Sequence, residues 1–87
     1  MGWRVNFGAK ATKEFAKLDT QTQQRIYDYA RWLETLDDPK QSGHGLVGGL
    51  SGFWRYRVGK YRLICAMQDN VLVIEVIRIA KRDEVYG

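Results

Sequence analysis

Residues 53–62 read Phe-Trp-Arg-Tyr-Arg-Val-Gly-Lys-Tyr-Arg, so that apolar or aromatic side chains alternate with arginines ahead of a glycine. Such alternation predicts a β-hairpin, and glycine at the first position of a two-residue loop favours a type II′ turn. With Gly59 and Lys60 as the loop, Arg57 lies directly opposite Arg62. Like charges in this arrangement destabilise a strand pair by roughly 0.2–1 kcal/mol. A hairpin that keeps both arginines is therefore predicted to bind an anion, and a phosphate backbone is the obvious candidate.

The rest of the chain predicts an α+β fold in which two helices pack on one face of a sheet. Apolar residues alternate in a short N-terminal strand and recur at helical spacing in the two segments after it. Besides the first strand of the hairpin, the predicted elements are a strand over residues 3–7, helices over 9–18 and 20–36, and strands over 61–67 and 71–79. We therefore expect a single domain spanning residues 1–87, with an antiparallel sheet made of the N-terminal strand and a three-stranded C-terminal meander.

Strand alternation gives the meander two faces, if the loop after residue 67 has three residues. The face predicted to pack against the helices carries Trp54, Tyr56, Val58, Leu63, Cys65, Met67, Val71, Val73, Ile77 and Ile79. The other face carries Arg55, Arg57, Arg62, Arg78 and Arg82, interspersed with Ile64, Ala66, Leu72, Ile74 and Val76. Glu75 also falls on this apolar face, where a carboxylate is unexpected unless it lies at the edge of the sheet or the predicted register is wrong. The mixed basic and apolar face is predicted to bind an anion and a partner protein.

The charge of the chain indicates the kind of partner it binds, and its cysteine content indicates the cellular compartment. The formal net charge is +4 and the pI is near 9.4, which favour an anionic partner. Residues 1–42 hold seven cationic and six acidic residues, whereas residues 43–87 hold seven and four, so the excess lies in the half with the hairpin. The single cysteine, Cys65, excludes an intrachain disulfide and favours a reducing compartment, with the thiol buried. No apolar run reaches the ~18–20 residues of a membrane span, so we expect a cytoplasmic protein with no membrane partner.

Residues 40–52 are rich in glycine and are predicted to form a loop. They lack the lysine and the serine or threonine that complete a phosphate-binding loop. His44, the only histidine, lies in this segment, and we predict an exposed loop residue in preference to a general base. No cysteine or histidine spacing suggests a metal site, and no cofactor is expected.

Three motifs occur in order along the chain: Trp-Arg-Tyr-Arg-Val-Gly at 54–59, Tyr-Arg-Leu at 61–63, and Ile-Ala-Lys-Arg-Asp-Glu-Val-Tyr at 79–86. Together they resemble the RelE branch of the RelE/ParE superfamily, the toxins of bacterial type II toxin–antitoxin systems. The resemblance covers essentially the whole chain. It implies a ribosome-dependent endoribonuclease that inhibits translation by cleaving mRNA in the ribosomal A site, through attack of a ribose 2′-hydroxyl on the adjacent phosphate.

Carried over position by position, the resemblance implies catalytic roles for Arg62, Arg82, Tyr86 and Lys81, and substrate-binding roles for Arg55 and Arg57. Lys60 at the hairpin tip and Arg78 on the last strand are predicted from their positions to bind substrate as well. Guanidinium groups hold phosphates and stabilise transition-state charge, as expected of Arg62 and Arg82. The ring of Tyr86 can stack on a base, or its hydroxyl can transfer a proton. Lys60 and Arg78 also fit solvent-exposed positions.

The general base is less clearly indicated. The best-known RelE proteins carry lysines where Arg55 and Arg57 stand, and an arginine releases a proton far less readily than a lysine. Some relatives have a histidine where this chain has Lys81. The base is therefore left open between Lys81 and Tyr86.

The resemblance also implies partners. A cognate antitoxin is expected to cover the mixed basic and apolar face with a helix whose acidic residues approach the arginines. The ribosome and mRNA are the expected targets, and operator DNA is expected to bind only to the toxin–antitoxin complex. The alternative is a ParE-like protein that inhibits DNA gyrase by binding, without RNA cleavage. The two share a fold, so the fold does not choose between them, whereas Arg62, Arg82 and Tyr86 together favour cleavage.

Overall fold

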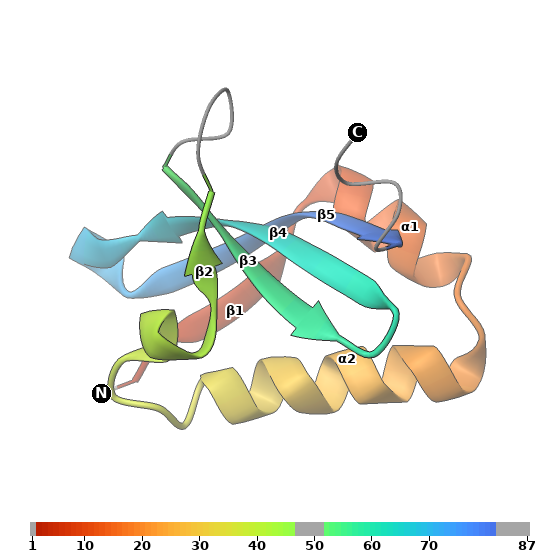
Figure 1. Cartoon of the computed structure of the whole chain (residues 1–87), viewed down its shortest axis with the longest axis horizontal. Coiled ribbons are helices and arrows are strands. Elements are labelled where there is room, and N and C mark those ends of the chain that lie inside the picture. The colour runs from red at the N-terminus through yellow and green to blue at the C-terminus, as the bar shows by residue number, and fades with distance from the viewer. Residues whose placement is uncertain (1, 47–51, 82–87) are drawn as a thin grey trace.

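The computed structural model describes residues 2–46 and 52–81 and confirms the α+β class (Figure 1). Along the chain the elements are β1 (Arg4–Phe7), α1 (Ala9–Ala16), α2 (Thr20–Leu33), β2 (His44–Gly45), β3 (Phe53–Val58), β4 (Tyr61–Gln68) and β5 (Val73–Lys81). Short 3₁₀ turns at Pro39–Ser42 and Asp69–Val71 precede β2 and β5. Both predicted helices are present, and each ends two or three residues before its predicted end.

The strands form one mixed sheet in the order β1-β5-β4-β3-β2. β1 pairs in parallel with β5, from Arg4 opposite Val73 to Phe7 opposite Val76, and every other pair is antiparallel. The prediction of an antiparallel N-terminal strand was therefore wrong. A two-residue loop forces neighbouring strands to run antiparallel, whereas the long connection from β1 to β5, through both helices, leaves their relative direction free.

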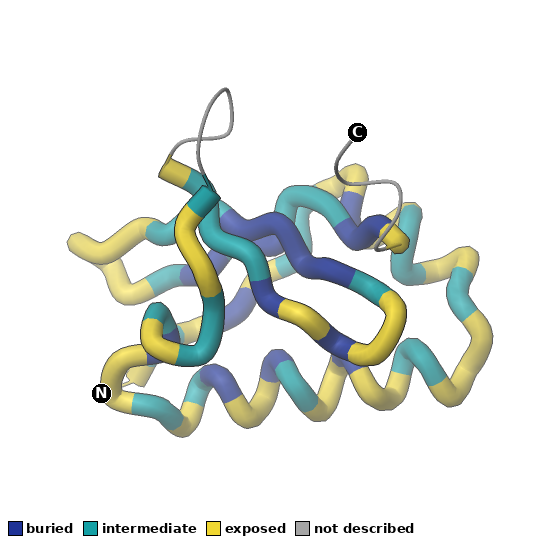
Figure 2. Tube along the Cα trace, in the orientation of Figure 1, coloured by how far each residue is buried: buried dark blue, intermediate teal, exposed yellow. Residues whose placement is uncertain are grey.

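Helix α2 illustrates how the sequence sets both its start and its buried side. The Asp19 side chain caps the helix by accepting hydrogen bonds from the Thr22 amide (3.2 Å) and hydroxyl (2.6 Å). Ile26, Ala30 and Leu33 follow at helical spacing and are buried. Figure 2 shows the buried stretches of α2 on its side toward the sheet. They join residues of α1 and of four strands in a single core.

A β-bulge interrupts the pairing of β4 with β5. Ile64 lies opposite Arg78 and Cys65 lies opposite Val76, so Ile77 has no partner on β4. One extra residue in β5 reverses the alternation of everything before it.

The bulge corrects the predicted faces of β5. Ile74 and Val76, predicted on the basic face, are buried in the core. Val73 and Ile77, predicted in the core, are only partly buried. Glu75 lies between two core residues and therefore faces away from the core, which removes the anomaly in its predicted position. The connection to β5 is also longer than predicted, because the Asp69–Val71 turn is followed by a residue in the left-handed conformation.

The hairpin of β3 and β4 is confirmed in detail. Arg57 lies opposite Arg62, and Val58 lies opposite Tyr61. Gly59 has a φ of 59°, and it is the only one of the two loop residues with a positive φ, as the predicted type II′ turn requires.

Residues 40–52 were predicted to form a loop, but they contain most of the Pro39–Ser42 turn and β2, and residues 47–51 lie outside the described residues. The buried Tyr56 hydroxyl donates to the Pro39 carbonyl (3.0 Å), and the Trp54 indole N–H donates to the Lys40 carbonyl (3.0 Å). A Cβ added at Gly43 would lie 2.6 Å from a β3 carbonyl oxygen, so only glycine fits there. These contacts hold the segment tightly against β3.

Candidate functional site

The side of β3 and β4 that faces away from the helices carries the predicted arginines, and we call it the arginine face. Residues paired directly across strands share a face, so the register aligns side chains in rows. One row contains His44, Arg55, Ile64 and Arg78, and the next contains Arg57, Arg62 and Ala80. Arg55, Arg57 and Arg62 are thus brought together, as the sequence predicted.

His44, predicted as an exposed loop residue, is exposed as expected but belongs to a strand. His44 lies in β2 directly opposite Arg55, so its side chain belongs to the arginine face. It is flanked by Gly43 and Gly45, whose Cα atoms lie against the aromatic rings of β3; a Cβ at Gly45 would be 3.1 Å from the Trp54 ring. The only signal in the sequence was the Gly-His-Gly run before an aromatic strand, which is typical of a backbone that approaches its neighbour closely.

A polar hollow of about 260 Å³ opens beside this row, and we call it the basic hollow. Ser42, His44, Arg55 and Arg57 line it. Two guanidinium groups supply hydrogen-bond donors in a geometry that suits phosphate, and an imidazole can either accept or donate. The basic hollow can therefore hold an anion and exchange a proton with it.

Arg62 differs from its neighbours in burial. Only 8% of its surface is exposed, whereas Arg57 opposite it is exposed. A buried guanidinium is held in a narrow range of positions and acts in surroundings of low dielectric constant, where its charge has a greater effect than in water. This environment suits a group that stabilises charge at a fixed point.

Arg78 is engaged in the fold. Its Nε lies 3.0 Å from Glu14 Oε2, and Glu14 Oε1 accepts a hydrogen bond from the Ile79 amide at 2.7 Å. The carboxylate of α1 thereby holds the edge of β5 beyond the end of β1. A substrate-binding role for Arg78 would have to compete with this ion pair.

Lys60 and Lys81 lie apart from the arginine face. They line a separate polar hollow of about 370 Å³, together with Asp19 and Arg25, where the tip of the hairpin meets the start of α2. Lys81 follows the core residue Ile79 by two positions in β5, which places it on the helix side of the sheet. Arg82 and Tyr86, the other predicted catalytic residues, lie outside the described residues.

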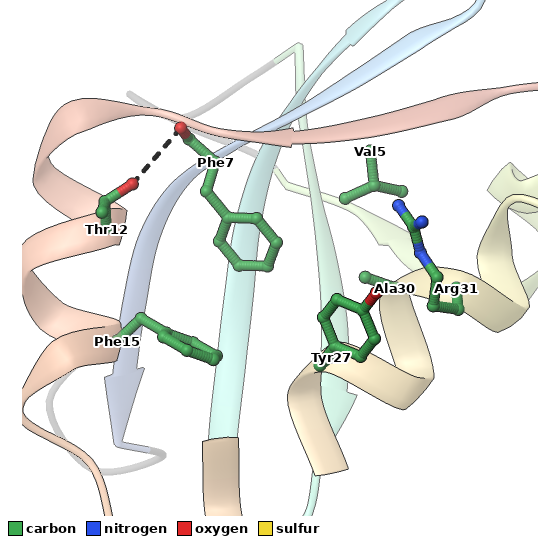
Figure 3. Close-up of a pocket in the computed structure, with 7 residues that line it drawn as sticks. All are labelled: Val5, Phe7, Thr12, Phe15, Tyr27, Ala30 and Arg31. Atoms are coloured by element: carbon green, nitrogen blue, oxygen red, sulfur yellow. Dashed lines mark hydrogen bonds between the residues drawn. The ribbon is translucent and has the colours of Figure 1, made fainter. Parts of the chain in front are cut away.

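A third hollow, of about 270 Å³, is apolar and lies between β1 and the two helices (Figure 3). Val5, Phe7, Phe15 and Ala30 are among its apolar lining residues, and Thr12 donates to the Phe7 carbonyl there (3.4 Å). Arg31 at its rim is ion-paired with a glutamate. This hollow can shelter an apolar group, but its lining offers no acid–base pair.

Two buried titratable groups are also unsuited to catalysis. Burial raises the pKa of the Tyr56 phenol and of the Cys65 thiol, so both stay protonated at neutral pH. Cys65 is fully buried in the core, as predicted. Within residues 2–46 and 52–81, no cluster of three or more potential metal ligands occurs, and no helix is long and apolar enough to cross a membrane.

Comparison with solved structures finds the same fold in chains of known toxin–antitoxin complexes. The RelBE2 toxin–antitoxin complex of Mycobacterium tuberculosis contains a chain with a TM-score of 0.85 and 24% identity, over 94% of this chain and 100% of that one. The archaeal RelE–RelB complex of Pyrococcus horikoshii OT3 gives 0.75 and 22%, over 98% and 100%. The intact RelBE complex of E. coli gives 0.70 and 18%, over 91% and 95%. No curated protein matches the sequence.

The described fold is therefore the one found in these RelE and RelBE structures. The sequence profile described as "ParE toxin of type II toxin-antitoxin system, parDE" matches residues 5–86, and the chain belongs to that family of toxins. The resemblance proposed from the sequence is confirmed at the level of the RelE/ParE superfamily.

Proposed function

We propose that this toxin is a ribosome-dependent endoribonuclease that cleaves mRNA in the A site. The observation that carries the proposal is the convergence of Arg55, Arg57 and Arg62 on the arginine face, next to a polar hollow. Arg57 opposite Arg62 is unfavourable in itself, because like charges across a strand pair repel, so the pair supports a surface that binds an anion. A phosphate that receives donors from both strands would offset that cost.

The proposed reaction is attack of a ribose 2′-hydroxyl on the adjacent phosphate. Arg55 and Arg57, which are accessible from the basic hollow, hold the phosphate backbone. Arg62, buried beside Arg57, stabilises the charge that develops in the transition state. Arg82 and Tyr86 are assigned to transition-state charge and to base stacking by the family resemblance. Lys60 and Lys81, on the other side of the hairpin, are better placed to contact backbone phosphates farther along the RNA or the ribosome.

Ribosome dependence follows from what the arginine face lacks in its described part. The basic hollow on this face is lined by Ser42, His44, Arg55 and Arg57, none of which is a carboxylate that could orient a hydroxyl. In-line alignment of the 2′-hydroxyl must then come from the decoding site, where the ribosome holds the mRNA. We therefore propose that the protein acts in the cytoplasm, where ribosomes are.

Primer extension on an mRNA translated in a purified system tests the proposal. The toxin should introduce cuts within the codon held in the A site, and it should cut the same transcript poorly without ribosomes. Equal cleavage of naked and translating mRNA would contradict ribosome dependence. Intact mRNA under both conditions would contradict endoribonuclease activity altogether.

A matched pair of variants tests the assigned roles. Arg62→Ala should lower the saturated cleavage rate by roughly 10²–10³, the scale for one preorganised donor. Arg57→Ala should mainly weaken binding and flatten its salt dependence. Because Arg62 is buried, circular dichroism must show that Arg62→Ala is folded, and Arg62→Lys provides a second variant that keeps a cation at this position. Parental rates in both Arg62 variants would remove it from the site.

A second candidate function is inhibition of DNA gyrase by binding, and the ParE description of the matched family favours it. In that case the arginine face would bind protein or DNA and no RNA would be cut. Gyrase-dependent DNA breaks in treated cells, with mRNA intact, would support this candidate over the first.

The protein has a cognate antitoxin, as the toxin–antitoxin systems of its family and its structural relatives indicate. We propose that the antitoxin covers the arginine face with acidic side chains and that operator DNA binds only to the resulting complex. The apolar contacts first predicted for this surface need revision, because Ile74 and Val76 lie in the core and Ile64 is only 4% exposed. Charge complementarity should therefore dominate the interface.

A further inference from the structure

We propose that His44 is a catalytic residue that accepts the proton of the attacking 2′-hydroxyl. This inference rests on the proposed endoribonuclease function and supplies the general base that the arginines cannot provide. A guanidinium group stays protonated at any physiological pH, so Arg55 and Arg57 can bind phosphate but cannot take up a proton. Among the residues that line the basic hollow, His44 is the one whose side-chain type commonly exchanges protons near neutral pH.

The sheet register places His44 beside the phosphate-binding arginines. His44 and Arg55 are a directly opposed pair across β2 and β3, and side chains of such pairs leave the sheet about 4.5–5.5 Å apart at Cβ. Arg57 follows Arg55 on the same face, and both reach the hollow that His44 lines. In RNA the 2′-hydroxyl lies on the ribose directly attached to the phosphate that it attacks. A phosphate held by the two arginines would therefore bring that hydroxyl to the imidazole.

The backbone around His44 is fixed, as a catalytic group requires. The Trp54 indole N–H and the Tyr56 hydroxyl hold the preceding turn through two carbonyls, each at 3.0 Å. Gly43 has no room for a side chain, because an added Cβ would meet three β3 atoms at 2.6–2.8 Å. His44 itself remains exposed, so the imidazole is accessible from solvent while its backbone is not free to move away.

The proton balance is simple. The 2′-oxygen gives its proton to the neutral His44 imidazole and forms a bond to phosphorus, and the bond between phosphorus and the 5′-oxygen breaks. The products are a 2′,3′-cyclic phosphate and a 5′-hydroxyl, whose oxygen takes a proton from water. The imidazolium returns its proton to solvent. No oxidant, reductant or metal is needed.

The test uses the full-length toxin in the purified translation system, with the single-turnover rate measured at saturating toxin. His44→Ala should lower this rate by about 10²–10⁴, the usual range for a general base, while binding to mRNA-loaded ribosomes stays close to parental. Added imidazole should restore part of the lost rate to His44→Ala and should leave the parental protein unaffected. Gln41→Ala, an exposed change in the same turn that does not line the hollow, serves as the matched control.

Three results would overturn the inference. His44→Ala could cleave at the parental rate, it could bind mRNA-loaded ribosomes more weakly while its saturated rate is unchanged, or its lowered rate could stay unchanged when imidazole is added. Failure of the proposed function is distinguishable, because the parental protein would then leave ribosome-bound mRNA uncut in the same assay. Melting curves of His44→Ala and the control variant show whether each remains folded. If His44→Ala is unfolded, His44→Gln, which keeps a side chain of similar size without a titratable group, replaces it and should show the same loss of rate.

Discussion

Glu14 should be one of the most important single side chains for the stability of this domain outside the core. Its two carboxylate oxygens join α1 to β5 across more than sixty residues of sequence, one to the Ile79 amide at 2.7 Å and the other to Arg78 Nε at 3.0 Å. The backbone bonds along this edge of β5 continue one residue past β1, where the Gly8 N–H donates to the Val76 carbonyl. At Ile79, farther along β5, the Glu14 carboxylate accepts the hydrogen bond that a neighbouring strand would otherwise accept. Replacing it with alanine removes both contacts at once.

The expected loss follows from the two contacts. A hydrogen bond from an amide to a charged acceptor contributes about 1.5–3 kcal/mol. The ion pair with Arg78 adds no more than about 1 kcal/mol, because the Arg78 side chain is 43% exposed and solvent screens it. Glu14→Ala should therefore lower the free energy of unfolding by about 1.5–4 kcal/mol, which for a domain of this size is at least about 6 °C in melting temperature. Alanine is the best helix former, so the loss cannot come from helix propensity.

Urea unfolding followed by circular dichroism measures this loss, with two companion variants. Glu14→Gln keeps an oxygen for the Ile79 amide but removes the charge, so it should lose less than Glu14→Ala. Lys13→Ala changes an exposed neighbour on α1 and should be nearly neutral. If the free energy of unfolding of Glu14→Ala lies within about 0.5 kcal/mol of the parental value, the carboxylate does not hold β5 and the proposed role of Glu14 at the strand edge is refuted.

Three further outcomes follow from other parts of the fold. Gly59→Ala should lower the free energy of unfolding by about 1–2 kcal/mol, because residue 59 has a φ of 59° and an added Cβ would also lie 3.2 Å from Arg25; an unchanged melting temperature would contradict the assigned turn. Cys65 should react slowly with iodoacetamide until urea unfolds the protein, since burial raises the pKa of its thiol, and rapid labelling of the native protein would argue against a closed core. Hydrogen bonds from Thr22 lower the pKa of Asp19 below its ordinary value of 3.8. The charged cap therefore stabilises the fold above that pH, and this stabilisation is lost as the pH falls through the lowered pKa. The difference in unfolding free energy between the parental protein and Asp19→Ala should shrink on acidification, and a constant difference would exclude the charged cap.

The parts of the fold that depend on local pattern were predictable. The hairpin followed from alternation and one glycine, because a two-residue loop fixes the register of both strands. The helices followed from the helical spacing of their apolar residues. The bulge in β5 did not, since inserting one residue costs little locally and is favoured only by the packing of Ile74 and Val76 on the helices.

The candidate site divides in the same way. The arginines of the hairpin could be predicted because the hairpin itself could. His44 could not be placed, because its position depends on two side-chain hydrogen bonds from β3 to carbonyls fourteen or more residues earlier. The ion pair of Arg78 with Glu14 could not be predicted either, since Glu14 lies near the other end of the chain.

The opposition of Arg57 and Arg62 bears on how the toxin and its antitoxin should interact. Like charges opposed across β3 and β4 are unfavourable, and an anion bound between the two guanidinium groups would offset this cost. RNA phosphates and antitoxin carboxylates would both do so, and by mass action either would stabilise the folded protein. Because they would use the same donors, they cannot be bound there together. If the antitoxin occupies the arginine face as we propose, it would neutralise the toxin by direct competition for the arginines, and the inhibited toxin would keep the same fold as the active one.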